Sequence, residues 1–141
     1  MIDVKELRIG NIANCYSSER KENIPFYVEQ IFVDEVYLQN EDEGFQIMAD
    51  RLDGIPLTEE LLLKCDVRPG KYYYSRADEI YSTPDANLVL YRKNNRYRFA
   101  REMMGVAGWV IVDVNGYDIT CFHQLQNIYY ALTGKELEVE L

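Results

Sequence analysis

The clearest hydrophobic periodicity in the chain lies near its end, in residues 121–134. Four apolar residues fall at i, i+3, i+4 and i+7, the spacing of one helix face, namely Leu125, Ile128, Tyr129 and Leu132. Four polar residues fall mostly on the opposite face: Gln124, Gln126, Asn127 and Thr133. Because so short a helix is marginally stable alone in water, we expect it to cover the hydrophobic interior.

Both ends of this helix carry sequence signals. Thr120 is the predicted N-cap, because its hydroxyl can accept a hydrogen bond from a first-turn N–H group. Gly134 is the predicted end, because glycine adopts the left-handed conformation without a Cβ clash. Leu137 would then fold back on the last helical turn.

The N-terminal half alternates apolar and polar residues in short runs, about ten residues apart, which is typical of antiparallel strands. The predicted strands cover residues 6–13, 26–33, 36–38 and 45–49, with a turn or bulge at Gly10-Asn11. Pro25 marks the entry to the second strand, and residues 40–44 form a solvated hairpin tip. The spacing predicts a small antiparallel barrel or a strongly bent sheet.

The middle of the chain begins with a short helix that starts after Thr58, with Glu59 and Glu60 in its first turn and Lys64 near its end. These charges match the helix dipole. Three further strand signals follow, at residues 71–74, 88–100 and 109–120. The last two are predicted hairpins, because Asn94-Asn95 and Asn115-Gly116 suit turns with positive φ angles.

The chain is therefore predicted to be a single α+β domain spanning residues 1–141. Most of it is antiparallel β-structure, arranged as a small barrel or bent sheet plus hairpins. One short helix lies in the middle, and the C-terminal helix packs on the sheet.

Composition narrows the class of protein. The chain has 141 residues, 48% of them hydrophobic, and a net charge of −9, which favours a folded soluble domain. Three widely spaced cysteines, an N-terminus unlike a signal peptide and the lack of a long apolar run predict a cytoplasmic protein without membrane contact. The charge is uneven, since residues 68–112 hold eight basic and four acidic residues.

His123, the only histidine, is the natural candidate for catalysis. With Gln124 and Asn127 it defines a candidate polar site on the C-terminal helix. General base catalysis needs an orienting partner and a nucleophile within reach, and Cys121 lies two positions away, which is not a facing position on a helix. We therefore expect a structural histidine, no catalytic residue, no metal and no cofactor.

The predicted 88–100 hairpin carries the second candidate site, for nucleic acid. Its cations are Arg92, Lys93, Arg96, Arg98 and Arg101, interleaved with Tyr91, Tyr97 and Phe99. Cations beside aromatic rings are typical of surfaces that bind single strands. On a strand, however, the aromatic side chains would point away from the arginines and into the core. The arginines could equally pair with the acidic N-terminal half, within the chain or across a dimer.

Three blocks of sequence resemble a known family. They are residues 6–11 (ELRIGN), 55–64 (IPLTEELLLK) and 123–137 (HQLQNIYYALTGKEL). They resemble a family of small uncharacterised proteins of gut Bacteroidetes, often found in prophage-like or mobile-element neighbourhoods. The chain departs from that pattern at Cys65-Asp66, where an aromatic residue and then glycine are expected. The resemblance implies a cytoplasmic accessory protein and no known activity.

The sequence thus favours a non-catalytic protein-interaction or accessory protein whose partner is another protein or a second copy of the chain. The alternative is a nucleic-acid-associated phage or mobile-element protein that uses the basic residues of segment 91–101. The negative net charge disfavours nucleic acid for the molecule as a whole.

Overall fold

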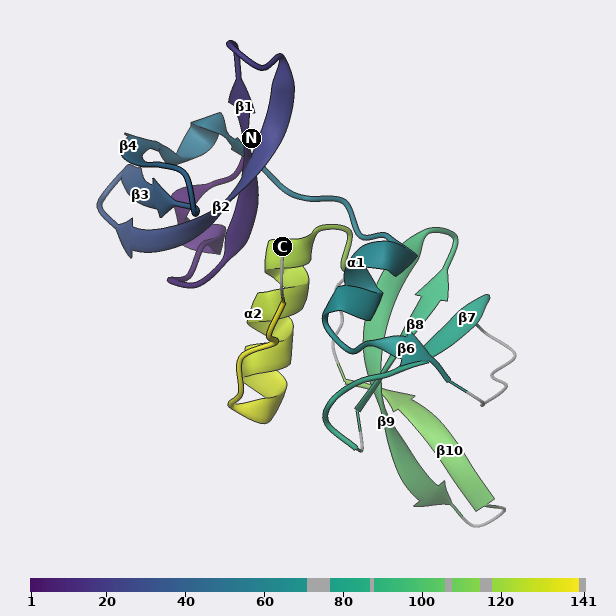
Figure 1. Cartoon of the computed structure of the whole chain (residues 1–141). Helices are drawn as coiled ribbons and strands as arrows, with labels where there is room; N and C mark the ends of the chain where they lie inside the picture. The colour runs from purple at the N-terminus through teal and green to yellow at the C-terminus, as the bar shows by residue number, and fades with distance from the viewer. Residues whose placement is uncertain (71–76, 87, 106–107, 115–117, 140–141) are drawn as a thin grey trace. The chain divides into compact units, whose positions relative to one another are not determined.

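The computed structural model describes residues 1–70, 77–86, 88–105, 108–114 and 118–139 (Figure 1). The chain forms two compact units. Unit 1 contains Met1–Pro56 and Cys121–Leu137, and unit 2 contains Leu57–Thr120. We describe each unit by itself, and the single-domain assignment stays a prediction. The α+β class with mostly antiparallel strands is confirmed.

Unit 1 is built on a five-stranded antiparallel sheet with the strand order β4-β3-β2-β1-β5. Its strands are β1 (Ile12–Ser17), β2 (Glu22–Ile31), β3 (Glu35–Gln39), β4 (Gly44–Met48) and β5 (Leu52–Asp53). Single 3-10 turns precede β1 (Val4–Glu6) and β5 (Ala49–Arg51). Its buried core includes Phe26, Val28, Val36, Leu38 and Leu52.

The connection between β4 and β5 forces this sheet to bend. The two strands lie at opposite edges of the sheet, yet only residues 49–51 separate them. A flat sheet would hold its outer strands about 19 Å apart, whereas the backbone from residue 48 to residue 52 can span at most about 14 Å. The predicted strongly bent sheet is confirmed, with β4 and β5 as its edges.

The prediction of a first strand over residues 6–13 was wrong for residues 6–11. Asp3 accepts a hydrogen bond from the backbone N–H of Lys5 and caps the 3-10 turn. This local cap competes with strand pairing, and a turn at Ile9-Gly10 follows, with Gly10 at φ 93°. β1 therefore begins only at Ile12.

Pro25 lies inside β2, opposite Asn14, and does not mark the start of that strand. It lies before Tyr27–Ile31, the part of β2 that pairs with β3. Its missing N–H can therefore face away from β1 without interrupting a second ladder.

Helix α2 (Phe122–Thr133) belongs to unit 1 and ends as predicted, at Gly134 with φ 72°. Its N-cap is Cys121 and not the predicted Thr120. Cys121 is held in extended conformation by a β-bridge to Pro56, and its N–H donates to Gln124 Oε1 at 3.2 Å. Leu125 and Tyr129 of the predicted apolar face are buried.

Unit 2 is built on a second antiparallel sheet with the order β10-β9-β8-β7-β6. Its strands are β6 (Arg68–Pro69), β7 (Glu79–Ser82), β8 (Leu88–Lys93), β9 (Arg96–Gly105) and β10 (Gly108–Asp113). The predicted β8–β9 turn is confirmed, since Asn94 and Asn95 have φ angles of 52° and 62°. Strands β6 and β7 were missed, and the predicted strand 71–74 and turn 115–116 lie outside the described residues.

Helix α1 (Glu59–Lys64) also lies in unit 2, with Thr58 as the predicted N-cap, whose hydroxyl accepts the Leu61 N–H at 3.2 Å. Asp66 follows the helix with φ 59°. This left-handed conformation is the one that glycine favours, and glycine is the residue that the family resemblance predicts there. Among the described residues, no helix is both long and apolar enough to cross a membrane.

Candidate functional site

The basic hairpin β8–β9 shows the predicted alternation of side chains. Tyr97 and Phe99 are buried, whereas Arg96 is exposed and Arg98 half-buried. Because successive side chains of a strand point to opposite faces, the aromatic rings serve the core of unit 2. They are not offered to solvent beside the arginines as stacking platforms for bases.

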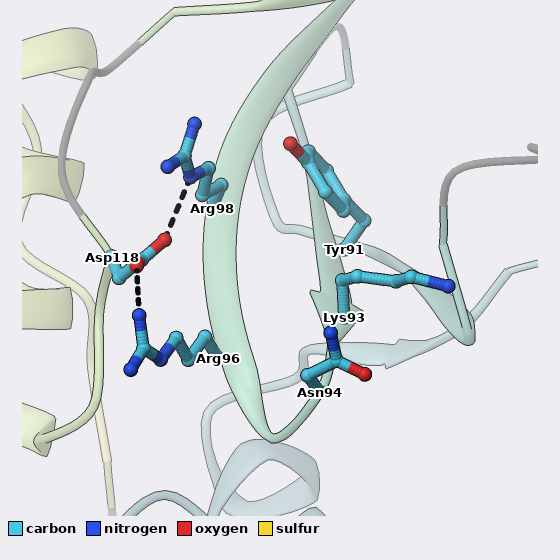
Figure 2. A pocket seen from close by; sticks show the side chains of 6 residues that line it. All are labelled: Tyr91, Lys93, Asn94, Arg96, Arg98 and Asp118. Carbon is cyan, nitrogen blue, oxygen red and sulfur yellow. Dashed lines mark hydrogen bonds and ion pairs between the residues drawn. The ribbon is translucent and has the colours of Figure 1, made fainter.

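Asp118 neutralises the two arginines at the centre of the hairpin (Figure 2). Its carboxylate accepts from Arg96 Nη1 at 3.0 Å and from Arg98 Nε at 2.8 Å. The neighbouring Ile119 pairs with Tyr97 through two backbone hydrogen bonds, which places Asp118 beside β9. The two guanidinium groups, Arg98 foremost, hold the pKa of Asp118 below its ordinary value.

Two more aspartates engage the hairpin cations. Asp78 lies 3.5 Å from Lys93 Nζ and accepts the backbone N–H of Asn94, which is the main cause of the lowered pKa of Asp78. Asp113 accepts from the Tyr91 hydroxyl at 2.9 Å and lies 3.7 Å from Arg98. The carboxylates that pair with the hairpin therefore come from unit 2 itself. Pairing with the acidic N-terminal half, within the chain or across a dimer, was the alternative that the sequence left open; the described partners of Lys93, Arg96 and Arg98 are Asp78, Asp113 and Asp118.

The remaining hairpin cations lie apart from this cluster. Arg92 is half-buried, and its contact with the Tyr81 side chain raises the pKa of Arg92. Arg101 is half-buried in β9 opposite Leu88 and Val112. The five predicted cations thus do not converge on one point.

The hairpin also borders an open depression, lined by Tyr91, Lys93, Asn94, Arg96, Arg98 and Asp118 (Figure 2). Its volume of about 230 Å³ is below the roughly 300–1,000 Å³ typical of ligand sites. A phosphate group there would have to displace Asp118 from two arginines. The arrangement favours a neutralised, structural hairpin.

His123, the centre of the predicted polar site, is only 3% exposed in α2. Neither ring nitrogen has a hydrogen-bond partner among the described residues, and the nearest carboxylate oxygen, Glu6 Oε1, is 3.9 Å from Nε2. Burial lowers the pKa of His123, so the ring is neutral at neutral pH. A Cβ at Gly54 would lie 3.2 Å from His123 Cε1 and 2.5 Å from Cys121 Sγ, so glycine lets the segment after β5 approach the start of α2.

The other two residues of the predicted polar site have structural partners. Gln124 accepts the Cys121 N–H and so closes the first turn of α2. Asn127 accepts from Asn11 Nδ2 at 2.7 Å and donates to the Glu6 carbonyl oxygen at 2.8 Å. These contacts join α2 to the segment before β1.

Gln126 is the polar residue that the sequence pattern placed wrongly. It is 3% exposed, its Oε1 accepts the Ile12 N–H at 2.9 Å, and its Nε2 donates to the Gly10 carbonyl oxygen at 3.2 Å. It was assigned to the solvated face because a hydrophobicity pattern cannot show that a side chain will satisfy the backbone at a turn more than 100 residues away.

Arg8 completes the junction between the two ends of unit 1. Its guanidinium group pairs with both carboxylate oxygens of Glu136 and lies 4.2 Å from the centre of the Tyr130 ring. The first and last blocks of the family resemblance therefore meet in this junction. Hydrogen bonding within unit 1 explains the residue types of these two blocks, without a catalytic role.

A further depression, missed by the sequence reasoning, lies in unit 1. It is bordered by residues 1–4, Glu6, Asp34 and residues 48–50, and its volume is about 410 Å³, within the range of binding sites. Next to Asp34, Phe32 and Val33 are 46% and 86% exposed, and Met48 is 41% exposed. The depression is formed by segments that are far apart in the sequence. The only sequence signal for it was the apolar pair Phe32-Val33 followed by the acidic pair Asp34-Glu35.

Comparison of the chain with protein-family models, with curated proteins and with solved structures finds no match.

Proposed function

We propose that this chain is a non-catalytic, cytoplasmic binding protein whose partner is another protein, contacted through unit 1. The observation that carries the proposal is the surface around the acidic depression. There, exposed Met48 lines the depression together with carboxylates, and exposed Phe32 and Val33 directly precede the lining residue Asp34 in the chain. Exposed apolar side chains with a polar rim are typical of protein-interaction sites.

The surroundings of His123 and of the basic hairpin also support a non-catalytic protein that binds another protein. A general base needs a hydrogen-bonded partner that orients it, and both nitrogens of His123 lack one among the described residues. A phosphate-binding strand needs available cations, and Arg96 and Arg98 are already bound by Asp118. Neither site offers the chemistry that its residue types require.

The family resemblance extends this proposal to a cellular setting. We place the chain among the accessory proteins of prophage-like or mobile elements in gut Bacteroidetes. Its three cysteines are free thiols, which supports a reducing compartment such as the cytoplasm.

The test is a comparative capture experiment in the native host. Tagged wild-type protein and two variants are crosslinked in cells, and the recovered proteins are quantified by mass spectrometry. Phe32→Ser with Val33→Ser removes the two exposed apolar side chains that precede Asp34, a residue that lines the depression. Ile9→Ser with Tyr16→Ser is the matched control, since these are also exposed apolar residues of unit 1.

The proposal predicts a protein partner that the wild type and the control recover and that the Phe32/Val33 variant loses by about tenfold or more. That factor corresponds to roughly 1.4 kcal/mol of binding free energy. Recovery of no protein above background, or equal recovery with the Phe32/Val33 variant, would contradict it.

A further inference from the structure

We infer that β4 binds an extended segment of the partner protein as an additional strand, and that this segment alternates apolar with basic side chains. The inference rests on the proposed function and specifies the partner and the mode of contact. Four features of unit 1 carry it: the direction of the β4 backbone groups, the lack of protection on β4, the side chains on its two faces, and the charge at its end.

The backbone of β4 presents a row of hydrogen-bonding groups to its free edge. Within unit 1 this strand pairs only with β3. The Ala49 N–H donates to the Asp34 carbonyl, and the Asn40 N–H to that of Glu43, so odd-numbered residues from 43 to 49 direct their backbone groups toward β3. Because these directions alternate along a strand, Gly44, Gln46 and Met48 direct theirs outward.

The two edges of the sheet differ in how they are protected. β5 has only two residues, and the N-terminal ammonium group forms an ion pair with its Asp53. β4 has five residues, Gly-Phe-Gln-Ile-Met, and contains neither proline nor a charged side chain. Natural proteins normally shorten, charge or cover such an edge to prevent the addition of another strand. An unprotected edge is the site that β-strand addition uses.

The two faces of β4 require an alternating pattern in the added strand. Phe45 and Ile47 are partly buried against the core, so they leave apolar surface for the inward side chains of a new neighbour. On the other face, Gln46 donates to the carboxylate of Glu35. Apolar side chains therefore fit the inner face, and basic ones the outer face.

The charge at the end of β4 selects a basic partner. Four carboxylates border the depression there: Asp3, Glu6, Asp34 and Asp50. Asp3 and Glu6 accept backbone N–H groups, whereas the side chains of Asp34 and Asp50 have no partner among the described residues. A second copy of the chain, with its net charge of −9, would bring like charges together at this edge, which is costly.

The probe is a random library of peptides about seven residues long, which can span β4 at roughly 3.3 Å per residue. The library is selected on the full-length protein. We expect enrichment of peptides in which lysine or arginine alternates with apolar residues, with binding that weakens as salt rises. Selection of no binder, or of binders without basic residues, would overturn the inference.

A proline variant then tests the mode of binding. Gln46→Pro removes an outward N–H group, which an edge strand tolerates, and Gln46→Val is the matched control that loses the same side chain and keeps the N–H. We expect the proline variant to bind selected peptides at least about tenfold more weakly than the valine variant. Equal binding by both variants would overturn strand addition.

N-methylated peptides keep the test decisive even when Gln46→Pro unfolds. Methylation of alternate backbone nitrogens blocks one edge of an extended peptide, and methylation of the other set blocks the opposite edge. We expect only one of the two methylated sets to lose binding. If neither set or both sets lose binding, strand addition is wrong. The proposed function would still stand if the capture experiment recovers a protein partner whose binding depends on Phe32 and Val33.

Discussion

At the scale of single residues, His123 shows how burial decides the role of a side chain. Its ring is enclosed in unit 1, and the desolvation of the charged form outweighs the attraction of Glu6, so the pKa of His123 is lowered. General base catalysis needs a partner that orients the imidazole, and neither ring nitrogen of His123 has a hydrogen-bond partner among the described residues. His123 is the residue that the sequence alone would suggest first for catalysis, but its surroundings in the structure support a structural role.

The stability of the protein should therefore depend on pH through His123. An unfolded chain binds a proton near pH 6.5, whereas the folded protein resists protonation until lower pH. The stabilisation is thus complete above about pH 6.5 and is lost as the pH falls toward the lowered folded pKa, at up to about 1.4 kcal/mol per pH unit. Urea unfolding at pH 7.5 and at pH 5.5 measures this loss.

His123→Leu is the control for that measurement. It removes two buried nitrogens that lack partners, so the free energy of unfolding at pH 7.5 should change by less than about 1.5 kcal/mol. The decrease in stability between pH 7.5 and 5.5 should be smaller than in the wild type. An unchanged pH dependence would show that another group causes it.

At the scale of elements, the docking of α2 depends on a few buried hydrogen bonds as well as on its apolar face. Gln126 satisfies the Ile12 N–H and the Gly10 carbonyl at the turn before β1. A buried backbone group that loses its partner costs about 1–3 kcal/mol. The attachment of the helix is therefore specified by a residue that a hydrophobicity pattern treats as surface.

We expect Gln126→Leu to lower the free energy of unfolding by about 2–4 kcal/mol, because it leaves two backbone groups unpaired. Gln30→Leu makes the same chemical change at an exposed position of β2, and it should change stability by less than about 0.5 kcal/mol. Thermal and chemical denaturation compare the two variants. Equal effects of both substitutions would contradict the role given to Gln126.

The sequence predicted the elements whose signals are local. Thr58, Gly134 and the Asn94-Asn95 turn act within a few residues, and each lies where it was expected. β6 and β7 were missed because they contain two and four residues, too few for a clear alternation. The acids that neutralise the hairpin, and the edge position of β4, depend on strand order, which no short pattern contains.

At the scale of the whole molecule, charge disfavours binding to nucleic acid. The net charge is −9, and the hairpin that carries the excess of basic residues holds Asp118 between two of its arginines. Long-range repulsion and local neutralisation act in the same direction. We therefore retain the proposal of a protein partner, contacted through unit 1.

A titration with labelled single-stranded and duplex DNA checks this conclusion. We expect no binding of either DNA at moderate salt. The variant that combines Arg96→Glu with Arg98→Glu should give the same titration as the wild type. Asp118→Asn is the informative companion, because it releases both arginines and should increase any residual binding at low salt. Tight, salt-sensitive binding that the double arginine variant abolishes would establish the nucleic-acid alternative.

The free edge of β4 is proposed to bind a strand of the partner, and amide hydrogen exchange tests this proposal directly. In the free protein, the amides of Gln46 and Met48 should exchange quickly, and that of Ile47 slowly, because, of these three residues, only Ile47 directs its N–H group toward β3. With a selected basic peptide bound, exchange at Gln46 and Met48 should slow by about tenfold or more, with little change at Ile47. Protected Gln46 and Met48 amides in the free protein, or unchanged exchange in the complex, would contradict strand addition at this edge.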